Sequence, residues 1–488
     1  MKKSSHAKII PIQLVSTQTS TASSSDELIS LCQEPGKIYS RSVGGRFARL
    51  RWVMVWVTQL VFYGIPWLQW NDRQAVLFNL SSSRFYIFGL VLHPQDLIYL
   101  AILMVLAALT LFFFTAVAGR LWCGYACPQT VYTEIFLWLE RVTEGDRLAR
   151  MRLDQAPWGI RKIARKSGKH ALWIGLSLFT GFTFVGYFTP IQALANELIA
   201  LSFSPWEWFW VLFYGFATYG NAGYLREQIC KQMCPYARIQ SALTDMDSMV
   251  IAYDVERGES RGSRTRAADP KALGLGDCID CTLCVQVCPT GIDIRNGLQN
   301  ECIACAACID VCDEVMEKMN YPKGLIRYSS GKGMADKLTA NQMVKRVWRP
   351  RVWFYSVLLL VVASIFIGGL STRKGFAVDV IKDRGAMARE TGNGDIENIY
   401  RLQIMNTTEQ MQTYTTRAQG LTGLKLVTDP VLNVPAAGIG SLTIRLTLPA
   451  EAAEEHRGKA SPIIFRVEAQ DNGKVVSVEE KSTFVIPR

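Results

Sequence analysis

The sequence is poor in charge and lacks the signature motifs of several large enzyme classes. Only 19% of its 488 residues are charged, against about a quarter in ordinary soluble proteins, whereas 49% are hydrophobic. It contains no P-loop, no glycine-rich dinucleotide-binding motif and no hydrolase nucleophile elbow. We therefore expect neither a nucleotide-driven enzyme nor a hydrolase, and any electrons that the protein uses must come from a partner.

Hydrophobic residues gather in five long stretches with the length and composition of transmembrane helices. Such a helix needs about 20 mostly apolar residues, and none of the five stretches contains Lys or Arg. Tryptophans such as Trp52, Trp70 and Trp353 lie near their ends, as expected at a membrane interface. The predicted spans are residues 52–70, 97–118, 171–190, 206–224 and 352–370.

Basic residues are distributed unevenly between these spans. Lys and Arg exceed Asp and Glu by 53 − 42 = 11. The segments 1–51, 71–96, 119–170 and 191–205 contain 8, 2, 10 and 0 basic residues, and basic segments stay in the cytoplasm. We expect a disordered, cytoplasmic N-terminal segment 1–51, a membrane domain at 52–224 and a cytoplasmic domain at 225–351. This asymmetry explains the positive charge without a nucleic-acid partner.

Eight cysteines of the segment 225–351 form two runs with the same spacing. In each run, successive cysteines are separated by two, two and three residues. This spacing is typical of bacterial two-cluster ferredoxins, in which the fourth cysteine of each run ligates the other cluster. A zinc ribbon would have cysteine pairs alone, and disulfides are not expected in the reducing cytoplasm. The spacing predicts one 4Fe–4S cluster on Cys278, Cys281, Cys284 and Cys312, and a second on Cys288, Cys302, Cys305 and Cys308.

Two further cysteine pairs share a different pattern, Cys-x-x-x-Cys-Pro. They are Cys123 with Cys127, and Cys230 with Cys234. In a helix this spacing places both thiols on one face, and both pairs follow spans expected to run from outside to inside. The four thiols could bind a third iron–sulfur cluster or Cu(I), which prefers soft sulfur ligands, or they could be buried free thiols. The sequence leaves these alternatives open.

The segment 371–488 has no cysteine and changes to short alternating strands, such as residues 440–448 and 462–468. This pattern predicts an all-β, immunoglobulin-like sandwich of about seven strands. Long segments cross the membrane largely regardless of their charge, so we expect this domain in the periplasm as a binding module. The predicted fold class is an α-helical membrane protein with five transmembrane helices, a cytoplasmic two-cluster ferredoxin domain and a C-terminal β-sandwich.

This arrangement resembles the FixG/RdxA/CcoG family of cytochrome c oxidase accessory proteins. The likeness runs from about Tyr39 to Arg488 and includes Cys-Gly-Tyr-Ala-Cys-Pro-Gln-Thr at 123–130, Gln-Ala-Val-Leu-Phe at 74–78 and Phe-Tyr-Ile-Phe-Gly-Leu at 85–90. The resemblance implies a protein of the bacterial inner membrane that assists assembly of the cbb-type oxidase by reducing Cu(II) to Cu(I). Its implied partners are oxidase assembly and copper-delivery proteins.

Two other functions fit the same motifs. One is a quinol-linked electron-transfer subunit similar to those of periplasmic nitrate reduction, which share both types of cysteine run but lack a long external sandwich. The other is an assembly scaffold whose clusters are only structural. The sequence does not identify the electron donor, which is either a quinol or a reduced carrier.

Overall fold

The computed structural model describes residues 37–487, except 72, 267, 271, 339, 383–387, 393, 455 and 472–473. The chain divides into two units, Met1–Ile38 and Tyr39–Arg488. The predicted disorder of the N-terminal segment falls largely on residues 1–36, which lie outside the described residues. The following description concerns the second unit.

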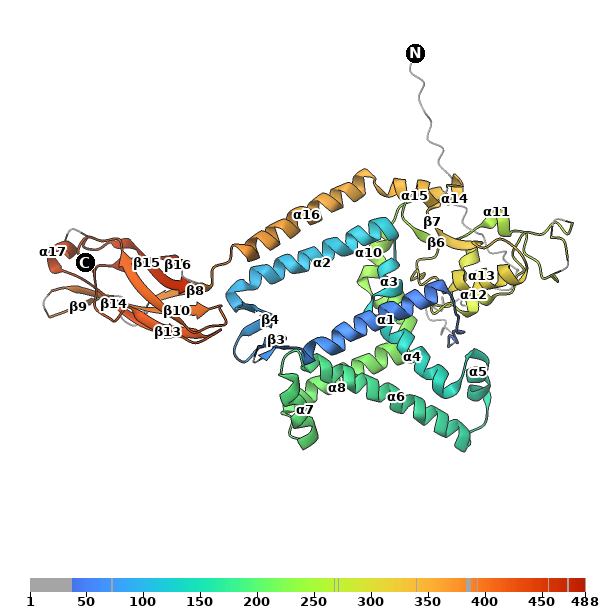
Figure 1. Ribbon diagram of the computed structural model, residues 1–488, viewed down its shortest axis with the longest axis horizontal. Coiled ribbons are helices and arrows are strands. Elements are labelled where there is room, and N and C mark those ends of the chain that lie inside the picture. The colour runs from blue at the N-terminus through green and yellow to red at the C-terminus, as the bar shows by residue number, and fades with distance from the viewer. Residues whose placement is uncertain are drawn as a thin grey trace, which may run out of the picture. The chain divides into compact units, whose positions relative to one another are not determined.

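Among the described residues, two helices are long and apolar enough to cross a membrane, and they match two of the predicted spans. They are α2, Leu97–Ala118, and α16, Pro350–Ser371. Within their most apolar 18 residues, 0% of α2 and 6% of α16 is buried, whereas a core helix of a soluble protein would be mostly covered. The two helices lie side by side, and the Tyr99 hydroxyl of α2 donates a hydrogen bond to the Gly369 carbonyl of α16 (Figure 1).

The other three predicted spans are not single helices, so their predicted bounds are wrong. Helix α1, Arg46–Gly64, ends well before residue 70 and continues as the 3-10 turn η1, Ile65–Trp67, because Pro66 lacks a backbone donor. Helix α6, Ile160–Val185, ends before Pro190. Helix α8, Pro205–Gly220, continues as a π-helical turn, η3, Asn221–Leu225. In each case the apolar sequence runs on after the backbone has left the α-helix.

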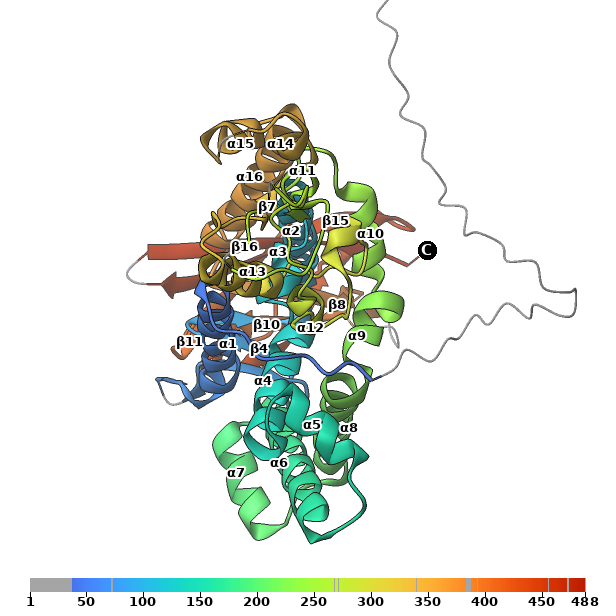
Figure 2. The ribbon, with the colours of Figure 1, turned by 90° about the vertical axis from the view of Figure 1, so that its right-hand side faces the viewer.

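Helices α6 and α8 pack closely at two glycines. A Cβ on Gly181 of α6 would collide with the Val211 carbonyl of α8, and one on Gly215 of α8 would crowd the side chain of Leu178. Small residues allow this close approach of two helices. The two helices run side by side in both ribbon views (Figures 1 and 2).

Shorter elements connect these helices. On the N-terminal side of α2 a small antiparallel sheet has the strand order β3-β4-β5. The elements up to residue 243 are β1 Gln69–Trp70, β2 Arg73–Gln74, β3 Val76–Asn79, β4 Arg84–Ile87, β5 Leu90–Leu92, η2 Pro94–Asp96, α3 Leu121–Tyr125, α4 Pro128–Glu144, α5 Arg147–Gln155, α7 Ile191–Ala200, α9 Arg226–Gln228, η4 Ile229–Met233 and α10 Pro235–Leu243.

The region of the eight central cysteines is built around one strand pair and two helices. Strand β6, Val250–Tyr253, pairs antiparallel with β7, Ile326–Ser329. Helices α12, Leu283–Gln286, and α13, Ala307–Lys318, each begin within a cysteine run. The smaller elements are α11 Val255–Gly258, η5 Ile294–Asn296, α14 Gly331–Ala335 and α15 Ala340–Val347.

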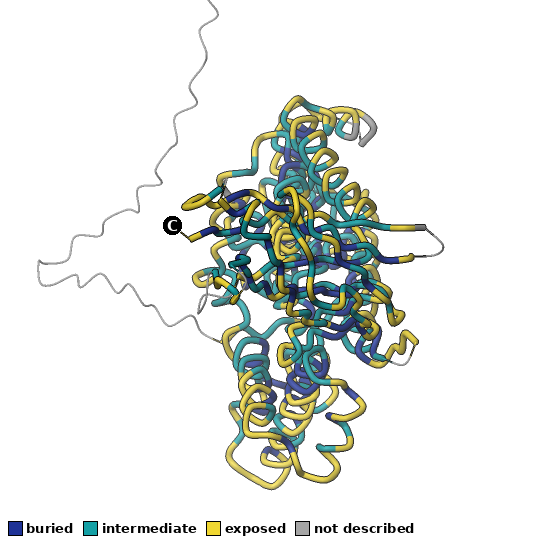
Figure 3. The backbone as a smooth tube through the Cα atoms, turned by 90° about the vertical axis from the view of Figure 1, so that its left-hand side faces the viewer, coloured by how far each residue is buried: buried dark blue, intermediate teal, exposed yellow. Residues whose placement is uncertain are grey.

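The C-terminal segment forms two antiparallel sheets packed around one core. One sheet has the order β12-β14-β10-β8, with β9 paired to β10, and the other has the order β13-β11-β15-β16. More and less exposed residues alternate along strands such as β14. Figure 3 colours the backbone by burial. The sandwich therefore has nine strands in its described part rather than about seven, because short strands such as β9 and β12 carry little hydrophobic pattern. The elements are β8 Phe376–Lys382, β9 Arg389–Glu390, β10 Ile396–Asn406, β11 Gln412–Gln419, β12 Lys425–Leu426, β13 Val431–Val434, β14 Ile439–Leu448, α17 Ala450–Glu454, β15 Ala460–Asp471 and β16 Lys474–Val485.

Candidate metal centres

The eight central cysteines line two small neighbouring cavities of about 30 and 20 Å³. The structure brings together each set of four that the spacing groups, including the fourth cysteine from the opposite run. Cys284 borders both cavities, so the cavities are adjacent. The first cavity is lined by Cys278, Cys281, Cys284 and Cys312, and the second by Cys288, Cys302, Cys305, Cys308 and Cys284.

The loops at the start of both runs share an unusual backbone. The second and fourth residues after the first cysteine have positive φ in each run: Asp280 and Thr282 in the first, Ala304 and Ala306 in the second. Residues of positive and negative φ therefore alternate in both loops, and such backbone can point successive N–H groups to one side, as in an anion-binding nest. A left-handed non-glycine residue costs about 1 kcal/mol or more. These loops have no recognisable signal in the sequence, because none of the four residues is glycine.

The thiols of these runs are held in a buried environment. Burial raises the pKa of Cys305 and Cys312 to about 12 and that of Cys302 to about 11. A cysteine must lose its proton to bind iron, so ligand binding here is coupled to proton release. Among the described residues no three Cys, His, Asp or Glu side chains form a ready site for a single ion. Four thiols around a cavity with nest amides fit a 4Fe–4S cluster, which supplies one-electron transfer when bound.

The paired cysteines do not lie on single helices, so the predicted helical face is wrong. Cys123 lies in α3, but Cys127 is extended and precedes α4, whose first residue is Pro128. Cys230 lies in the π-helical turn η4, and Cys234 is likewise extended, before α10. In both pairs the preceding helical turn ends before the second cysteine, and the proline after that cysteine starts a new helix.

The two pairs nevertheless meet. Burial, followed by the charge of neighbouring thiols from both pairs, raises the pKa of Cys123 to about 12 and that of Cys230 to about 11. Burial also raises the pKa of Cys127, and the nearby Cys234 thiol adds to this effect. The Cys123 thiol lies 3.5 Å from the Gln240 side-chain oxygen of α10. All four thiols therefore lie near enough to one another to interact, in a partly buried region that we call the paired-cysteine site.

The paired-cysteine site packs against the second cavity. Gly124 leaves no room for a side chain, because a Cβ there would lie 2.7 Å from the Ala304 carbonyl oxygen. Arg120, just before Cys123, donates to the backbone carbonyl of Asn300. The Tyr328 hydroxyl donates to the Ala304 carbonyl at 2.7 Å and lies 3.2 Å from the Tyr125 hydroxyl. The contacts of Arg120, Gly124 and Tyr125 join residues about 180 to 200 positions apart, so they have no local signal in the sequence.

The start of α1 docks on the same region. Asp310 of α13 accepts hydrogen bonds from the backbone N–H groups of Phe47 and Ala48, at 3.1 and 2.7 Å. A carboxylate at a helix N-terminus is favourable because it pairs with free N–H groups and the helix dipole. Arg51, which is buried, donates to the Cys305 carbonyl at 2.6 Å. One turn of α1 is thus fixed against the second cavity.

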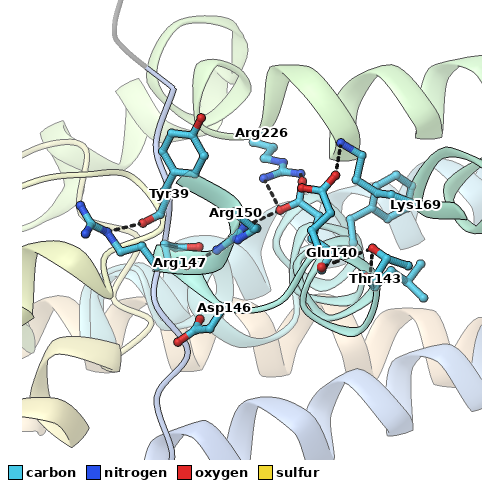
Figure 4. A network of polar contacts seen from close by, with 12 residues as sticks. Tyr39, Glu140, Thr143, Asp146, Arg147, Arg150, Lys169 and Arg226 are labelled. Carbon is cyan, nitrogen blue, oxygen red and sulfur yellow. Dashed lines mark hydrogen bonds and ion pairs between the residues drawn. The ribbon is translucent and has the colours of Figure 1, made fainter. Parts of the chain in front are cut away.

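A buried ion network holds the segment that carries Cys230. Arg150 and Arg226 converge on the carboxylate of Glu140, at 2.5 and 2.6 Å (Figure 4). Burial alone would raise the pKa of Glu140, but the Arg226 and Arg150 guanidinium groups outweigh it, and the pKa lies below its ordinary value. Gln129 of α4 also donates to the Arg226 carbonyl, at 3.2 Å. This network ties the turn before Cys230 to α4, which follows Cys127.

Three family models match the chain. A 4Fe–4S dicluster domain matches residues 225–331, which contain all eight central cysteines and also Cys230 and Cys234. A 4Fe–4S binding domain matches residues 100–143, which contain Cys123 and Cys127. The immunoglobulin-like fold at the C-terminus of FixG matches residues 366–487. The matches support iron–sulfur clusters and the C-terminal sandwich.

Full-length relatives are similar over most of their length. The chain is 37% identical over 422 residues to nitrogen fixation protein FixG of Rhizobium meliloti, which covers 80% of each protein. It is 36% identical over 459 residues to protein RdxA of Cereibacter sphaeroides, which covers 91% of this chain and 96% of RdxA. A crystal structure of a FixG-related protein from Vibrio parahaemolyticus aligns with 23% of this chain and 98% of that chain, at 20% identity and a TM-score of 0.20. From its identity with FixG and RdxA and its 4Fe–4S domains, the chain belongs to the FixG/RdxA family and is an iron–sulfur electron-transfer protein.

Proposed function

We propose that this protein reduces Cu(II) to Cu(I) and thereby assists maturation of the copper centre of a cbb-type cytochrome c oxidase. The observation that carries the proposal is the shared site of the four paired cysteines, directly against the loop of the second cavity. A cupric reductase needs ligands that hold Cu(I) and a donor of single electrons. A thiol-rich site beside an iron–sulfur cluster would supply both. In this reaction each Cu(II) ion gains one electron and becomes Cu(I), and no covalent bond forms or breaks.

The chemistry of the thiol site favours the reduced ion. Cu(II) prefers nitrogen and oxygen ligands, whereas Cu(I) prefers thiolates and thioethers. Met233, which precedes Cys234 and is 64% exposed, adds a thioether next to the site. The four thiols would therefore stabilise copper more strongly after it has gained an electron. A third iron–sulfur cluster on the same four cysteines is the alternative, and the family-model match over residues 100–143 supports it.

The proposal includes a membrane topology. The chain would span the bacterial inner membrane five times, through α1, α2, α6, α8 and α16, with its cysteine motifs in the cytoplasm and the sandwich in the periplasm. The alternation of basic residues between the spans and the exposed apolar surface of α2 and α16 support this topology. It keeps every motif cysteine in a reducing compartment. The cysteine-free sandwich would then bind oxidase assembly or copper-delivery proteins in the periplasm.

The proposed function is tested with the purified full-length chain. The protein is reduced anaerobically with dithionite, separated from excess reductant and mixed with Cu(II) and a chromogenic copper(I) chelator. Two 4Fe–4S clusters each give up one electron, so we expect about two Cu(I) per chain, formed as the cluster absorbance returns to its oxidised value. Protein that has not been reduced is the control. Reduced clusters that persist in the presence of Cu(II), with no Cu(I) formed, would refute the proposal.

A further inference from the structure

A large cavity lies between α1, α4 and α6 and has no role in the proposed copper chemistry. It encloses about 730 Å³, within the range of 300 to 1,000 Å³ that is usual for pockets binding small organic molecules. Its walls are mostly aromatic and aliphatic. They include Trp52, Trp56 and Tyr63 of α1 and Trp138 of α4. The rings of Trp52 and Trp138 meet edge to face, with centroids 6.3 Å apart.

Few polar side chains line this cavity, and Gln59 is one of them. The side-chain oxygen of Gln59 is buried and accepts no hydrogen bond from any described residue. A buried acceptor without a donor costs about 1–3 kcal/mol, and a ligand with a hydroxyl group would remove that cost. One turn further along α1, the Tyr63 hydroxyl lies 2.8 Å from that of Thr180. Arg141 lies in the lining as well.

The cavity shares two lining residues with a cleft that reaches the cysteine sites. Trp52 and Arg141 border both spaces, and the lining of the cleft also includes Cys230 and Cys305. An occupant of the cavity therefore lies one side chain away from the cleft between the paired-cysteine site and the second cavity. The opposite side of the cavity is apolar and open, since Trp56 and Leu60 are 62% and 66% exposed. In the proposed topology these two side chains face lipid.

We propose that this cavity binds a membrane-soluble quinol, which is the electron donor of the protein. A lipid acyl chain would fill the apolar part but would offer no hydroxyl group to Gln59 and no planar ring to the tryptophans. A quinol has both, together with an isoprenoid tail that suits the exposed apolar side. The assignment rests on the proposed function, because it supplies the electrons that copper reduction consumes.

The electrons and protons of the quinol can be accepted by the iron–sulfur clusters and by side chains of this protein. A quinol that is oxidised to a quinone loses two electrons and two protons, and the oxidants are the two 4Fe–4S clusters assigned to the central cysteines, which take up one electron each. The protons leave through the cleft, whose lining includes the carboxylates of Glu134 and Glu227. The openness of the cleft to solvent allows those carboxylates to pass the protons to water.

The site is tested by photolabelling of the full-length protein in phosphatidylcholine nanodiscs with an azidoquinone that carries a decyl tail. We expect the label on α1 or α4 and competition by decylubiquinone. Gln59→Leu should weaken that competition roughly tenfold, the loss of one buried hydrogen bond, and Trp138→Ala should weaken it at least as much. Trp353→Ala, at an exposed tryptophan of α16, is the matched control and should change nothing.

Anaerobic reduction provides the second measurement. Decylubiquinol should bleach the cluster absorbance of the unchanged protein and of Trp353→Ala faster than that of Gln59→Leu, whereas dithionite should reduce all three equally. Labelling elsewhere on the chain, equal competition by a saturated decyl alcohol, or an unaltered Gln59→Leu would overturn the quinol site. If the unchanged protein binds no quinol but still reduces Cu(II) after reduction with dithionite, the quinol site fails and the proposed function stands.

Discussion

The C-terminal sandwich and the cysteine-bearing region form their interiors from different groups. In the sandwich, Tyr400 and Phe465 are at most 1% exposed and their rings meet at 5.0 Å. The interior of the other region contains Cys278 and Cys284 among its buried residues, and further cysteines pack against them. The same thiols surround the two cavities.

This difference separates two sources of stability. Burial of a large hydrophobic side chain contributes about 1.5–3 kcal/mol, so the sandwich can fold on its side chains alone. A region whose interior is arranged around cavities for a metal cluster gains folding free energy when the metal binds. The two regions of one chain should therefore respond differently to the loss of iron.

Removal of iron should have the largest effect. After anaerobic chelation we expect rapid hydrogen exchange in α12, α13 and strands β6 and β7, because the thiols lose the group that holds them together. Strands β10 and β15 of the sandwich should keep their slow exchange. Rapid exchange in both regions would show that the sandwich depends on the clusters and would contradict the comparison.

Loss of a paired cysteine should abolish most copper reduction without unfolding either region. Because the four thiols share one site, Cys127→Ser and Cys234→Ser should each remove most activity, and the double variant should be scarcely worse. The EPR signals of the central clusters should persist in all three proteins. Mild losses that add in the double variant would indicate two separate structural thiol pairs.

Truncation of a core ring should damage the sandwich alone. Phe465→Ala removes a fully buried ring, so we expect a loss of about 3–5 kcal/mol in sandwich stability, measured by hydrogen exchange of β15. Iron content should not change. Val475→Ala, at a 66% exposed position of β16, is the matched control and should change stability by less than about 0.5 kcal/mol.

The smallest effect is expected at the buried ion network. Glu140→Gln leaves Arg150 and Arg226 with a neutral partner, at a cost of about 1.5–3 kcal/mol, and should speed exchange near Cys230. Because the pKa of Glu140 is lowered in the folded protein, its contribution is complete above about pH 4.3 and is lost as the pH falls through the folded value. The variant should therefore lose this acid sensitivity. If the variant and the unchanged protein lose stability equally as the pH falls, the network has no role in stability.

The sequence predicted local chemistry better than long-range contacts. The spacing of the central cysteines was enough to group the thiols that line each cavity, because the spacing of ligands along the chain follows the geometry of the cluster. It also predicted α2 and α16, whose hydrophobic runs have no interruption. The bounds of α1, α6 and α8 were wrong because apolar side chains continue beyond the residues at which the backbone turns.

Other features had no local signal. The paired cysteines look helical in sequence, but the proline after each pair starts a new helix. Gly124 packs on Ala304, and Asp310 accepts hydrogen bonds from the start of α1. These contacts join segments that are distant in the sequence, so no periodic pattern predicts them. The cavity beside Gln59 likewise depends on how three helices meet, so its residues look like ordinary membrane-facing side chains in the sequence.

The most direct test of the account is the iron and acid-labile sulfide content of the full-length protein purified without oxygen. Two 4Fe–4S clusters on the central cysteines predict about eight irons and eight sulfides per chain, and a third cluster on the paired cysteines raises both to about twelve. Tightly bound zinc with no sulfide would contradict the account.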